Sequence, residues 1–295
     1  YGIDNWNEVK VKVNGGYLYG NILEPSDNSK STIVIITAGS GPTDRDGNSS
    51  ILTGRNDSLK YLAYGLKDKG IASFRYDQRP SGKSYRTLTD KNINFDLLVE
   101  DLVECIKYIK VNKNYDKIYL IGHSQGALIS VLAAQQEDVD GVVTIAGAVR
   151  PIDMILLDQV KRQDKELSEI LEVELEKIKA GMDSTSENKE IKQLLSGENG
   201  EFIRRWMEYD PEAEVKKLDI PVYFIYGTAD LQIKPSELDY LDDIINDNNY
   251  KILENMNHVL KVSPEDEKEN LKRYSYPGYP LHPELIKSIE EFIIS

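Results

Sequence analysis

The sequence predicts an α/β fold in which a mostly parallel sheet is covered by helices on both faces. Continuous apolar, β-branched runs such as residues 32–37 alternate along the chain with stretches of helical periodicity such as residues 95–109. Runs of this kind are typical of strands buried on both sides, as parallel sheets require. The alternation breaks over residues 151–217, where only charged, amphipathic helical stretches occur. We therefore expect a core formed by residues 1–150 and 218–295, with a helical cap inserted between them.

The composition is that of a soluble globular protein. Of the 295 residues, 40% are hydrophobic and 29% are charged. The net charge of −14 argues against nucleic acid or an anionic membrane as a partner, because both bind clustered Lys and Arg. No apolar run approaches the roughly 18 residues that span a bilayer, and no signal-peptide core is visible, although the chain begins with Tyr1. We expect a soluble protein, cytoplasmic rather than secreted, whose oligomeric state stays open.

The first half of the chain carries clear strand and helix patterns. Segments 8–13 and 17–23 alternate apolar and polar residues around Gly15-Gly16, which predicts an antiparallel hairpin. A long polar loop rich in glycine is expected from residue 38 to about residue 56. The other elements expected here are strands at 32–37, 71–76 and 117–121 and helices at 58–69, 95–109 and 127–134.

The second half adds three strands around the inserted segment. Buried strands are predicted at 141–146 and 222–226, with a short last strand at 250–253 and a final helix after Pro283. Within the insertion, a helical stretch is expected over 167–180, with polar breaks at 183–188 and 196–200. Additional core helices are the alternative to a cap, but the high charge and the breaks favour a cap.

The most informative motif is Gly122-His123-Ser124-Gln125-Gly126, which joins a predicted buried strand to a helix of small residues. A sharp turn from strand to helix holds the central serine in a strained backbone conformation with its hydroxyl exposed. The two glycines fit this turn, because side chains there would block the close approach of helix and strand. We predict that Ser124 is a nucleophile rather than an ordinary turn serine.

The sequence has three histidines, so the base that activates Ser124 can be sought by elimination. His123 neighbours the serine in the turn, where its side chain should point away and pack. His282 precedes the final helix and suits a loop or capping role. His258 follows the last predicted strand, at the edge where α/β sheets place their sites. His258 is the predicted base, with His282 as the alternative.

A carboxylate that orients the histidine is expected after another strand, between serine and histidine in sequence. Asp230 meets this condition, since it lies shortly after the strand predicted at 222–226. The alternative for Asp230 is a turn residue or a helix N-cap. The predicted triad is Ser124, Asp230 and His258, in which the carboxylate orients the imidazole that takes the serine proton.

Acyl transfer also needs N–H donors for the oxyanion of the tetrahedral intermediate, each worth about 3–4 kcal/mol. The backbone N–H of Gln125, first in the helix after the serine, is expected to supply one. The second should come from the loop after strand 32–37, where glycines allow close approach to a substrate. Ser40 is the predicted second donor, and Gly41 is the alternative.

Several segments carry a family resemblance beyond the serine motif. They are 38–48 (AGSGPTDRDGN), 76–79 (YDQR), 227–230 (GTAD) and 256–258 (MNH). Together they resemble the α/β-hydrolase superfamily, and within it the esterase branch related to the serine-aminopeptidase-like hydrolases. One departure is that Pro80 follows Arg79, where relatives commonly have glycine.

The resemblance implies an α/β-hydrolase fold with a helical cap after the sixth strand, and hydrolysis of short-chain acyl esters. It also implies catalytic roles for Ser124, Asp230 and His258, with Ser40 and Gln125 supplying the oxyanion hole.

No cofactor and no metal are expected. The three scattered histidines and the single cysteine do not have the spacing of a zinc site. Segment 44–48 (DRDGN) differs from a calcium loop because its glycine comes too early, and no acidic residue occupies the twelfth position. Cys105 falls on the apolar side of helix 95–109 and is expected to be a core residue.

A charged network is predicted to brace the oxyanion loop. Its members are Asp44, Arg45, Asp46, Asp77 and Arg79. Simple solvent exposure of these side chains is the alternative.

These residues predict a serine carboxylesterase that acts on a small-molecule ester. An aminopeptidase, a thioesterase or an acyltransferase could use the same machinery, and glutamates of the cap could bind a free amino terminus. A non-catalytic binding protein on a hydrolase scaffold is a further alternative, against which the intact triad argues. The acyl length depends on how the cap closes over Ser124.

Overall fold

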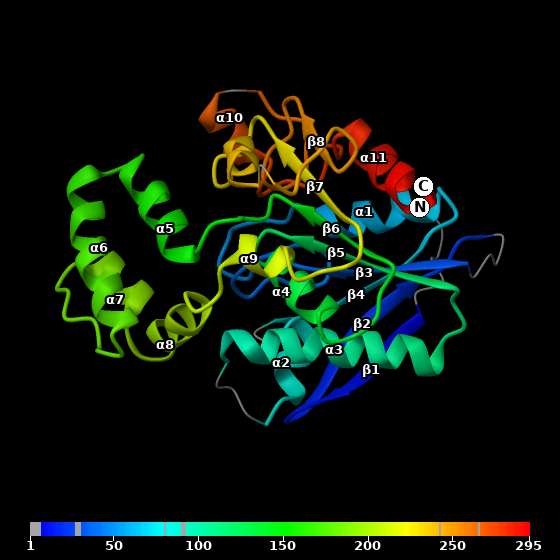
Figure 1. The fold of residues 1–295 in the computed structure, drawn as a ribbon, viewed down its shortest axis with the longest axis horizontal. Helices are drawn as coiled ribbons and strands as arrows, with labels where there is room; N and C mark the ends of the chain where they lie inside the picture. Colours follow the sequence, from blue (N-terminus) through cyan, green and yellow to red (C-terminus); the bar gives the residue numbers. More distant parts are fainter. Residues whose placement is uncertain (1–6, 27–30, 80, 90–92, 242, 265) are drawn as a thin grey trace.

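The structure is a computed structural model that describes residues 7–26, 31–79, 81–89, 93–241, 243–264 and 266–295. Among these residues the strands are β1 Asn7–Val13, β2 Gly16–Leu23, β3 Thr32–Thr37, β4 Ala72–Tyr76, β5 Lys117–His123, β6 Gly141–Ile145, β7 Val222–Gly227 and β8 Tyr250–Leu253. They form one sheet in the order β1-β2-β4-β3-β5-β6-β7-β8 (Figure 1). The strands from β4 to β8 in this order are parallel, and β2 is antiparallel to both of its neighbours. The predicted mostly parallel sheet is confirmed.

Burial along the strands follows the sequence patterns. In β1, Val9, Val11 and Val13 are buried while the residues between them are exposed, so this strand has one face on the core. Every residue of β3 is buried, as expected for a strand covered on both sides. The hairpin between β1 and β2 is confirmed, and Gly15 adopts the positive φ of 78° that its turn requires.

Helices cover both faces of the sheet. Those outside residues 151–217 are α1 Ser58–Lys67, α2 Gly82–Thr87, α3 Phe95–Asn112, α4 Gln125–Ala134, α10 Glu267–Lys272 and α11 Pro283–Ile294. Helices α3 and α4 pack with Ile33 and Ile35 of β3, whereas α1 and α11 pack with Val34 and Ile36 on the opposite face (Figure 1). This alternation along β3 is the two-residue period of a strand, and it divides the apolar core into two layers.

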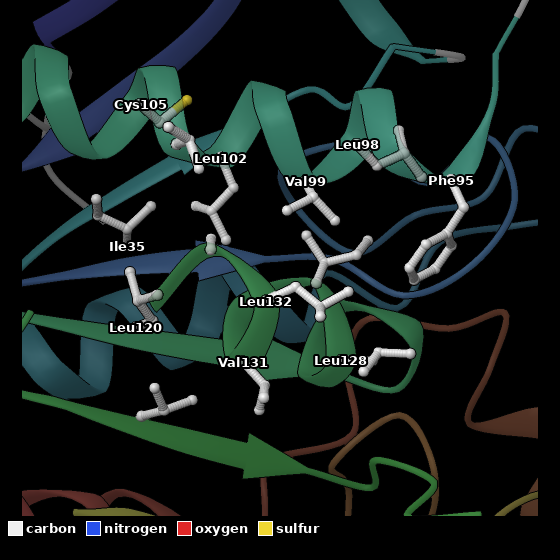
Figure 2. Packing of buried hydrophobic residues seen from close by; sticks show 14 of the residues in the cluster. Ile35, Phe95, Leu98, Val99, Leu102, Cys105, Leu120, Leu128, Val131 and Leu132 are labelled. Atoms are coloured by element: carbon white, nitrogen blue, oxygen red, sulfur yellow. The ribbon is translucent and has the colours of Figure 1, made fainter. Parts of the chain in front are cut away.

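Helix α3 packs in the core layer that contains Ile33 and Ile35 of β3. Figure 2 shows Leu98, Val99 and Leu102 pointing from α3 toward Leu128 and Leu132 of α4 and toward the sheet. Cys105 lies on the same helix and is fully buried, so the predicted core role is confirmed.

The short helix α2 was not expected. It begins in the segment SGKS at 81–84, and Gly82 opens it with a positive φ of 54°. A Cβ atom on Gly82 would lie 2.2 Å from the carboxylate of Asp77, so only glycine fits. Pro80 precedes this segment and is the residue at which the sequence departs from the related esterases. It lies outside the described residues.

Five helices lie between β6 and β7. They are α5 Ile152–Lys161, α6 Lys165–Lys179, α7 Lys189–Leu195, α8 Gly197–Trp206 and α9 Pro211–Val215. In Figure 1, α5 to α8 form a group beside the sheet, and α9 lies next to α4. The helical stretch predicted at 167–180 and the break at 183–188 are confirmed. The break predicted at 196–200 is wrong, because Ser196 alone separates the two helices, ending α7 and preceding α8.

Contacts near both ends of this helical group attach it to the rest of the chain. Phe95 of α3 stacks on Trp206 of α8 with ring centroids 5.3 Å apart, and Asp96 accepts a hydrogen bond of 2.6 Å from the hydroxyl of Tyr209. At the other end, Arg150 precedes α5; its Nη1 lies 2.8 Å from the carboxylate of Asp158 on α5, and its Nη2 lies 2.6 Å from the buried carboxylate of Glu237. The helical group is therefore held to the rest of the chain near both of its ends.

Glu174 of α6 holds the segment that follows the helix. Its carboxylate accepts hydrogen bonds from Lys177, from the hydroxyl of Ser184 and from the N–H of Thr185, at 2.5, 2.7 and 2.7 Å. Burial disfavours the charged form of Glu174, but these donors outweigh it and lower its pKa from 4.5 to about 2. Because the folded pKa is the lower one, this contribution to stability is present above pH 4.5 and is lost as the pH falls toward 2.

Replacing Glu174 with Gln is expected to lower the free energy of unfolding by about 1–3 kcal/mol at pH 7. The difference from the original chain should shrink toward pH 2, where Glu174 becomes protonated. Thermal melts at both pH values check this expectation. Glu176→Gln, at an exposed position of the same helix, should leave the melts unchanged. An equal loss for Glu174→Gln at both pH values would contradict the assigned ionisation.

Candidate active site

Ser124 lies between the end of β5 and the first residue of α4, in the sharp turn that its motif predicts. Its backbone has φ 54° and ψ −121°, a strained conformation for a residue with a side chain. A Cβ atom on Gly122 would lie 2.2 Å from the carbonyl oxygen of Gly126, and one on Gly126 would lie 2.5 Å from that of Thr37. Both glycines are therefore required for the helix to start this close to the sheet.

Asp230 and His258 are brought together from the ends of β7 and β8. The Nδ1–H of His258 donates to Oδ2 of Asp230 at 2.8 Å. The other carboxylate oxygen, Oδ1, accepts the N–H groups of Gln232 and Ile233 at 2.7 and 3.0 Å. Asp230 is 1% exposed and His258 is 5% exposed. The carboxylate is thus fixed from one side by the backbone and orients the imidazole on the other.

His123 connects the serine turn to the loop that carries His258. Its Nε2–H donates to the backbone carbonyl of His258 at 2.7 Å, and the two rings lie 4.9 Å apart. Burial, and to a smaller extent neighbouring His258, lower the pKa of His123 to about 3. His123 is therefore a neutral donor near pH 7. This role goes beyond the packing role predicted from sequence.

His282 takes no part in the hydrogen bond between His258 and Asp230. It is the N-cap of α11, where its Nδ1 accepts the N–H of Glu284, and its Nε2 contacts the carbonyl of Glu254 at 3.0 Å. The capping role considered for it in the sequence is confirmed.

The predicted oxyanion loop passes beside the serine. A Cβ atom on Gly39 would lie 3.2 Å from Cβ of Ser124, and Gly41 adopts a positive φ of 76°. The carbonyl of Ser40 accepts the hydroxyl of Thr43 at 3.0 Å, and that of Gly41 accepts the Thr43 N–H at 2.8 Å.

Buried Gln78 holds the start of the same loop. Its Nε2 donates to the carbonyls of Ala38 and Gly39 at 2.7 and 3.3 Å. The carbonyl oxygens of residues 38–41 thus all have protein donors. The N–H of Gln125 has no acceptor within its own helix, as for any first helical residue.

Four of the five charged residues predicted to brace the loop are linked, because buried Arg75 pairs with Asp46 and also donates to the carbonyl of Arg45 at 3.4 Å. Arg45 holds Asp77 with two hydrogen bonds, from Nε at 2.9 Å and Nη2 at 2.7 Å. Burial disfavours ionisation of Asp77, but the bonds from Arg45 outweigh it and keep its pKa below the ordinary value. Asp46 pairs with buried Arg75 at 2.5 Å.

The prediction that Arg79 belongs to this network is wrong. Arg79 pairs with Asp101 of α3 at 2.7 Å and donates to the carbonyl of Asn14 at 2.9 Å, so it links the hairpin to α3. The carboxylate of Asp44 accepts N–H groups of its own loop, those of Asp46 and Asn48. Sequence proximity suggested that Arg79 joins the network, but its buried partner, Asp101, comes from a distant helix.

A cavity of about 740 Å³ opens beside Ser124. Its lining includes Ser40, Gly41 and Gln125 from the serine region, apolar side chains from the core helices, and apolar side chains from α5, α7 and α8. The apolar residues among them include Leu98, Leu128, Ile152, Ile155, Leu156, Leu194, Phe202, Ile203 and Trp206. We call this cavity the chamber. Asp230 and His258 are buried and do not line it.

A family model described as serine aminopeptidase, S33, matches residues 53–265 of the chain. The chain belongs to this family. The match includes Ser124, Asp230 and His258 and both attachments of the helical group, but not Ser40 or Gly41.

Two relatives of known name match parts of the chain. Esterase EstD of Thermotoga maritima is 31% identical over 270 residues, which is 87% of this chain and 61% of EstD. Triacylglycerol lipase 1 of Arabidopsis thaliana is 33% identical over 108 residues, which is 34% of this chain and 27% of the lipase. The chain thus spans less than two thirds of the length of both relatives.

Est1E from Butyrivibrio proteoclasticus has a similar structure, with a TM-score of 0.59 at 15% identity, covering 97% of both chains. A dienelactone hydrolase from Anabaena variabilis has a TM-score of 0.56 at 16% identity, covering 99% of this chain and 96% of its own. At such identities the likeness shows the fold alone. The predicted α/β-hydrolase fold is confirmed.

In the part of the chain that the structure describes, no three or more His, Cys, Asp or Glu side chains gather in a way that could hold a metal ion. None of the helices in those residues combines the length and apolarity needed to cross a bilayer.

Proposed function

We propose that the chain hydrolyses carboxylic esters through Ser124, Asp230 and His258. The observation that carries this proposal is the 2.8 Å hydrogen bond between His258 and Asp230. It lies at the carboxyl ends of the parallel strands, where Ser124 also lies, with its positive φ. The hydrogen bond from His123, the residue before Ser124, to the carbonyl of His258 supports their convergence. The likeness to EstD, which is named an esterase, favours an ester over other acyl compounds.

In the proposed mechanism, Oγ of Ser124 attacks the ester carbonyl while Nε2 of His258 takes the hydroxyl proton. Asp230 stabilises the imidazolium that forms. The N–H groups of Gln125 and Ser40 stabilise the oxyanion, and Gly41 is the alternative to Ser40. His258 then protonates the leaving alcohol, and water hydrolyses the acyl-enzyme by the same route.

The test compares three substrate classes at equal concentration. Hydrolysis of p-nitrophenyl esters is expected, with little turnover of aminoacyl anilides or acyl-CoA. Treatment with a fluorophosphonate should give an adduct on Ser124. Absence of both ester turnover and the adduct would favour a non-catalytic binding protein.

We further propose that residues 151–217 act as a cap over the site and that the chamber takes the apolar part of the ester. The lining of aliphatic and aromatic side chains from α5, α7 and α8 supports this role. Pockets of this volume bury most of a drug-sized ligand. The resemblance implies a short-chain acyl group, and in this proposal the chamber holds the acyl chain.

Filling the chamber is expected to change the choice of substrate. Leu156 of α5 lines the chamber, so Leu156→Trp should lower kcat/KM for octanoate esters about tenfold more than for acetate esters. Met154→Trp, at an exposed position of the same helix, is the matched control and should leave the ratio unchanged. Equal effects of Leu156→Trp on both esters would place the apolar group elsewhere.

An aminopeptidase is the second candidate. Glu190 and Glu198 line the chamber, and carboxylates of this kind could bind the free amino terminus of a peptide. Faster turnover of aminoacyl anilides than of esters, lost on Glu190→Gln or Glu198→Gln, would favour it.

A further inference from the structure

The two loops that carry Asp230 and His258 come from different strands and must keep a fixed separation. They touch directly where a Cβ atom on Gly227 would lie 2.1 Å from the carbonyl oxygen of Met256. The N–H of Ala229 donates to that same carbonyl at 3.1 Å. These contacts lie at the base of the loops, and both Asp230 and His258 follow them in sequence.

A second connection runs through two buried side-chain amides. Nδ2 of Asn270 donates to the carbonyl of Ala229 at 2.7 Å, next to Asp230. Oδ1 of Asn270 accepts Nδ2 of Asn257 at 2.9 Å, next to His258. Asn270 lies on α10, which follows β8 and supplies none of the triad residues, so a third element bridges the two loops.

The amides have a single consistent orientation. Oδ1 of Asn257 accepts the N–H of Lys261 at 3.0 Å, which fixes its Nδ2 as the donor to Asn270. Asn270 must then present its oxygen to Asn257 and its Nδ2 to Ala229. Reversing either amide would face donor with donor and acceptor with acceptor. Both asparagines are 0% exposed, so water cannot replace a lost bond.

We propose that Asn257 and Asn270 are positioning residues that set the distance between Asp230 and His258. The proposal rests on the proposed function, in which that hydrogen bond orients the base. The amide of Asn270 binds the carbonyl of the residue before Asp230, Asn257 directly precedes His258, and neither asparagine lines the chamber. A shift of about 1 Å in such a site can reduce turnover about a hundredfold.

The test replaces Asn270 with Leu, which has a similar size and no hydrogen-bonding atoms. We expect kcat for ester hydrolysis to fall about 10–100-fold with KM unchanged. The downfield N–H resonance of the His258–Asp230 hydrogen bond, assigned by its loss in His258→Gln, should shift or broaden. If Asn270→Leu does not fold, Asn257→Asp serves instead, since it keeps the acceptor for Lys261 and removes the donor to Asn270.

A matched control separates positioning from general stability. Ile293→Ala removes buried volume from α11, away from the two loops, and should lower the melting temperature without changing kcat or the resonance. Unchanged kcat and resonance in the asparagine variants, or an equal loss of kcat in Ile293→Ala, would overturn the proposal. If the original chain turns over no ester, the proposed function fails, and the resonance alone decides the positioning role.

Discussion

Replacing Ser124 with Ala is expected to reduce kcat for ester hydrolysis about a millionfold, to the level left by binding and the oxyanion donors. The loss follows because no other hydroxyl occupies the strained turn between β5 and α4, so no acyl-enzyme can form. The melting temperature should stay within a few degrees of the original, since a single hydroxyl is removed. Steady-state assays with p-nitrophenyl esters measure the change.

Ser130 supplies the matched control for this substitution. It lies on the same helix, and its buried Oγ has no hydrogen-bond partner among the described residues. Ser130→Ala should therefore keep full activity and stability. Substantial turnover by Ser124→Ala would contradict the assigned nucleophile.

Replacing Asp230 with Asn is expected to lower kcat about 10⁴-fold. The amide can still accept the N–H groups of Gln232 and Ile233 through its oxygen, which leaves its NH₂ group facing Nδ1 of His258. His258 would then carry its proton on Nε2, the atom that must accept the serine proton. The fold should be preserved, and the rate of fluorophosphonate labelling of Ser124 should fall with kcat.

Asp239→Asn is the control for the charge change, because Asp239 is exposed on the 3₁₀ helix Pro235–Tyr240 that follows the Asp230 loop. Its kcat should equal that of the original chain. A loss in Asp239→Asn as large as in Asp230→Asn would point to net charge rather than to the tautomer of His258.

Most of the sheet could be predicted because its strands carry their own signals. The run 32–37 is β-branched and buried throughout, and the alternation in 8–13 marks the exposed face of an edge strand. The turn at Ser124 could be predicted equally well, because the close approach that requires its two glycines arises within a motif of five residues.

Other features depend on contacts between distant segments. Helix α2 is six residues long and fits against Asp77, so its pattern is too short to be recognised. The bond from His123 to the carbonyl of His258 joins residues 135 positions apart. Arg79 pairs with Asp101, which in sequence is one acid among several on an amphipathic helix. No local pattern specifies such partners, because only the packed chain brings them within reach.

The two outer strands of the sheet limit how the molecule can aggregate. On β1, Glu8, Lys10 and Lys12 point to solvent, and charged side chains on an edge strand oppose pairing with another chain. At the opposite edge, β8 has only four residues, which offers a short template for an added strand. Both outer strands thus oppose the strand-by-strand association that leads to fibrils.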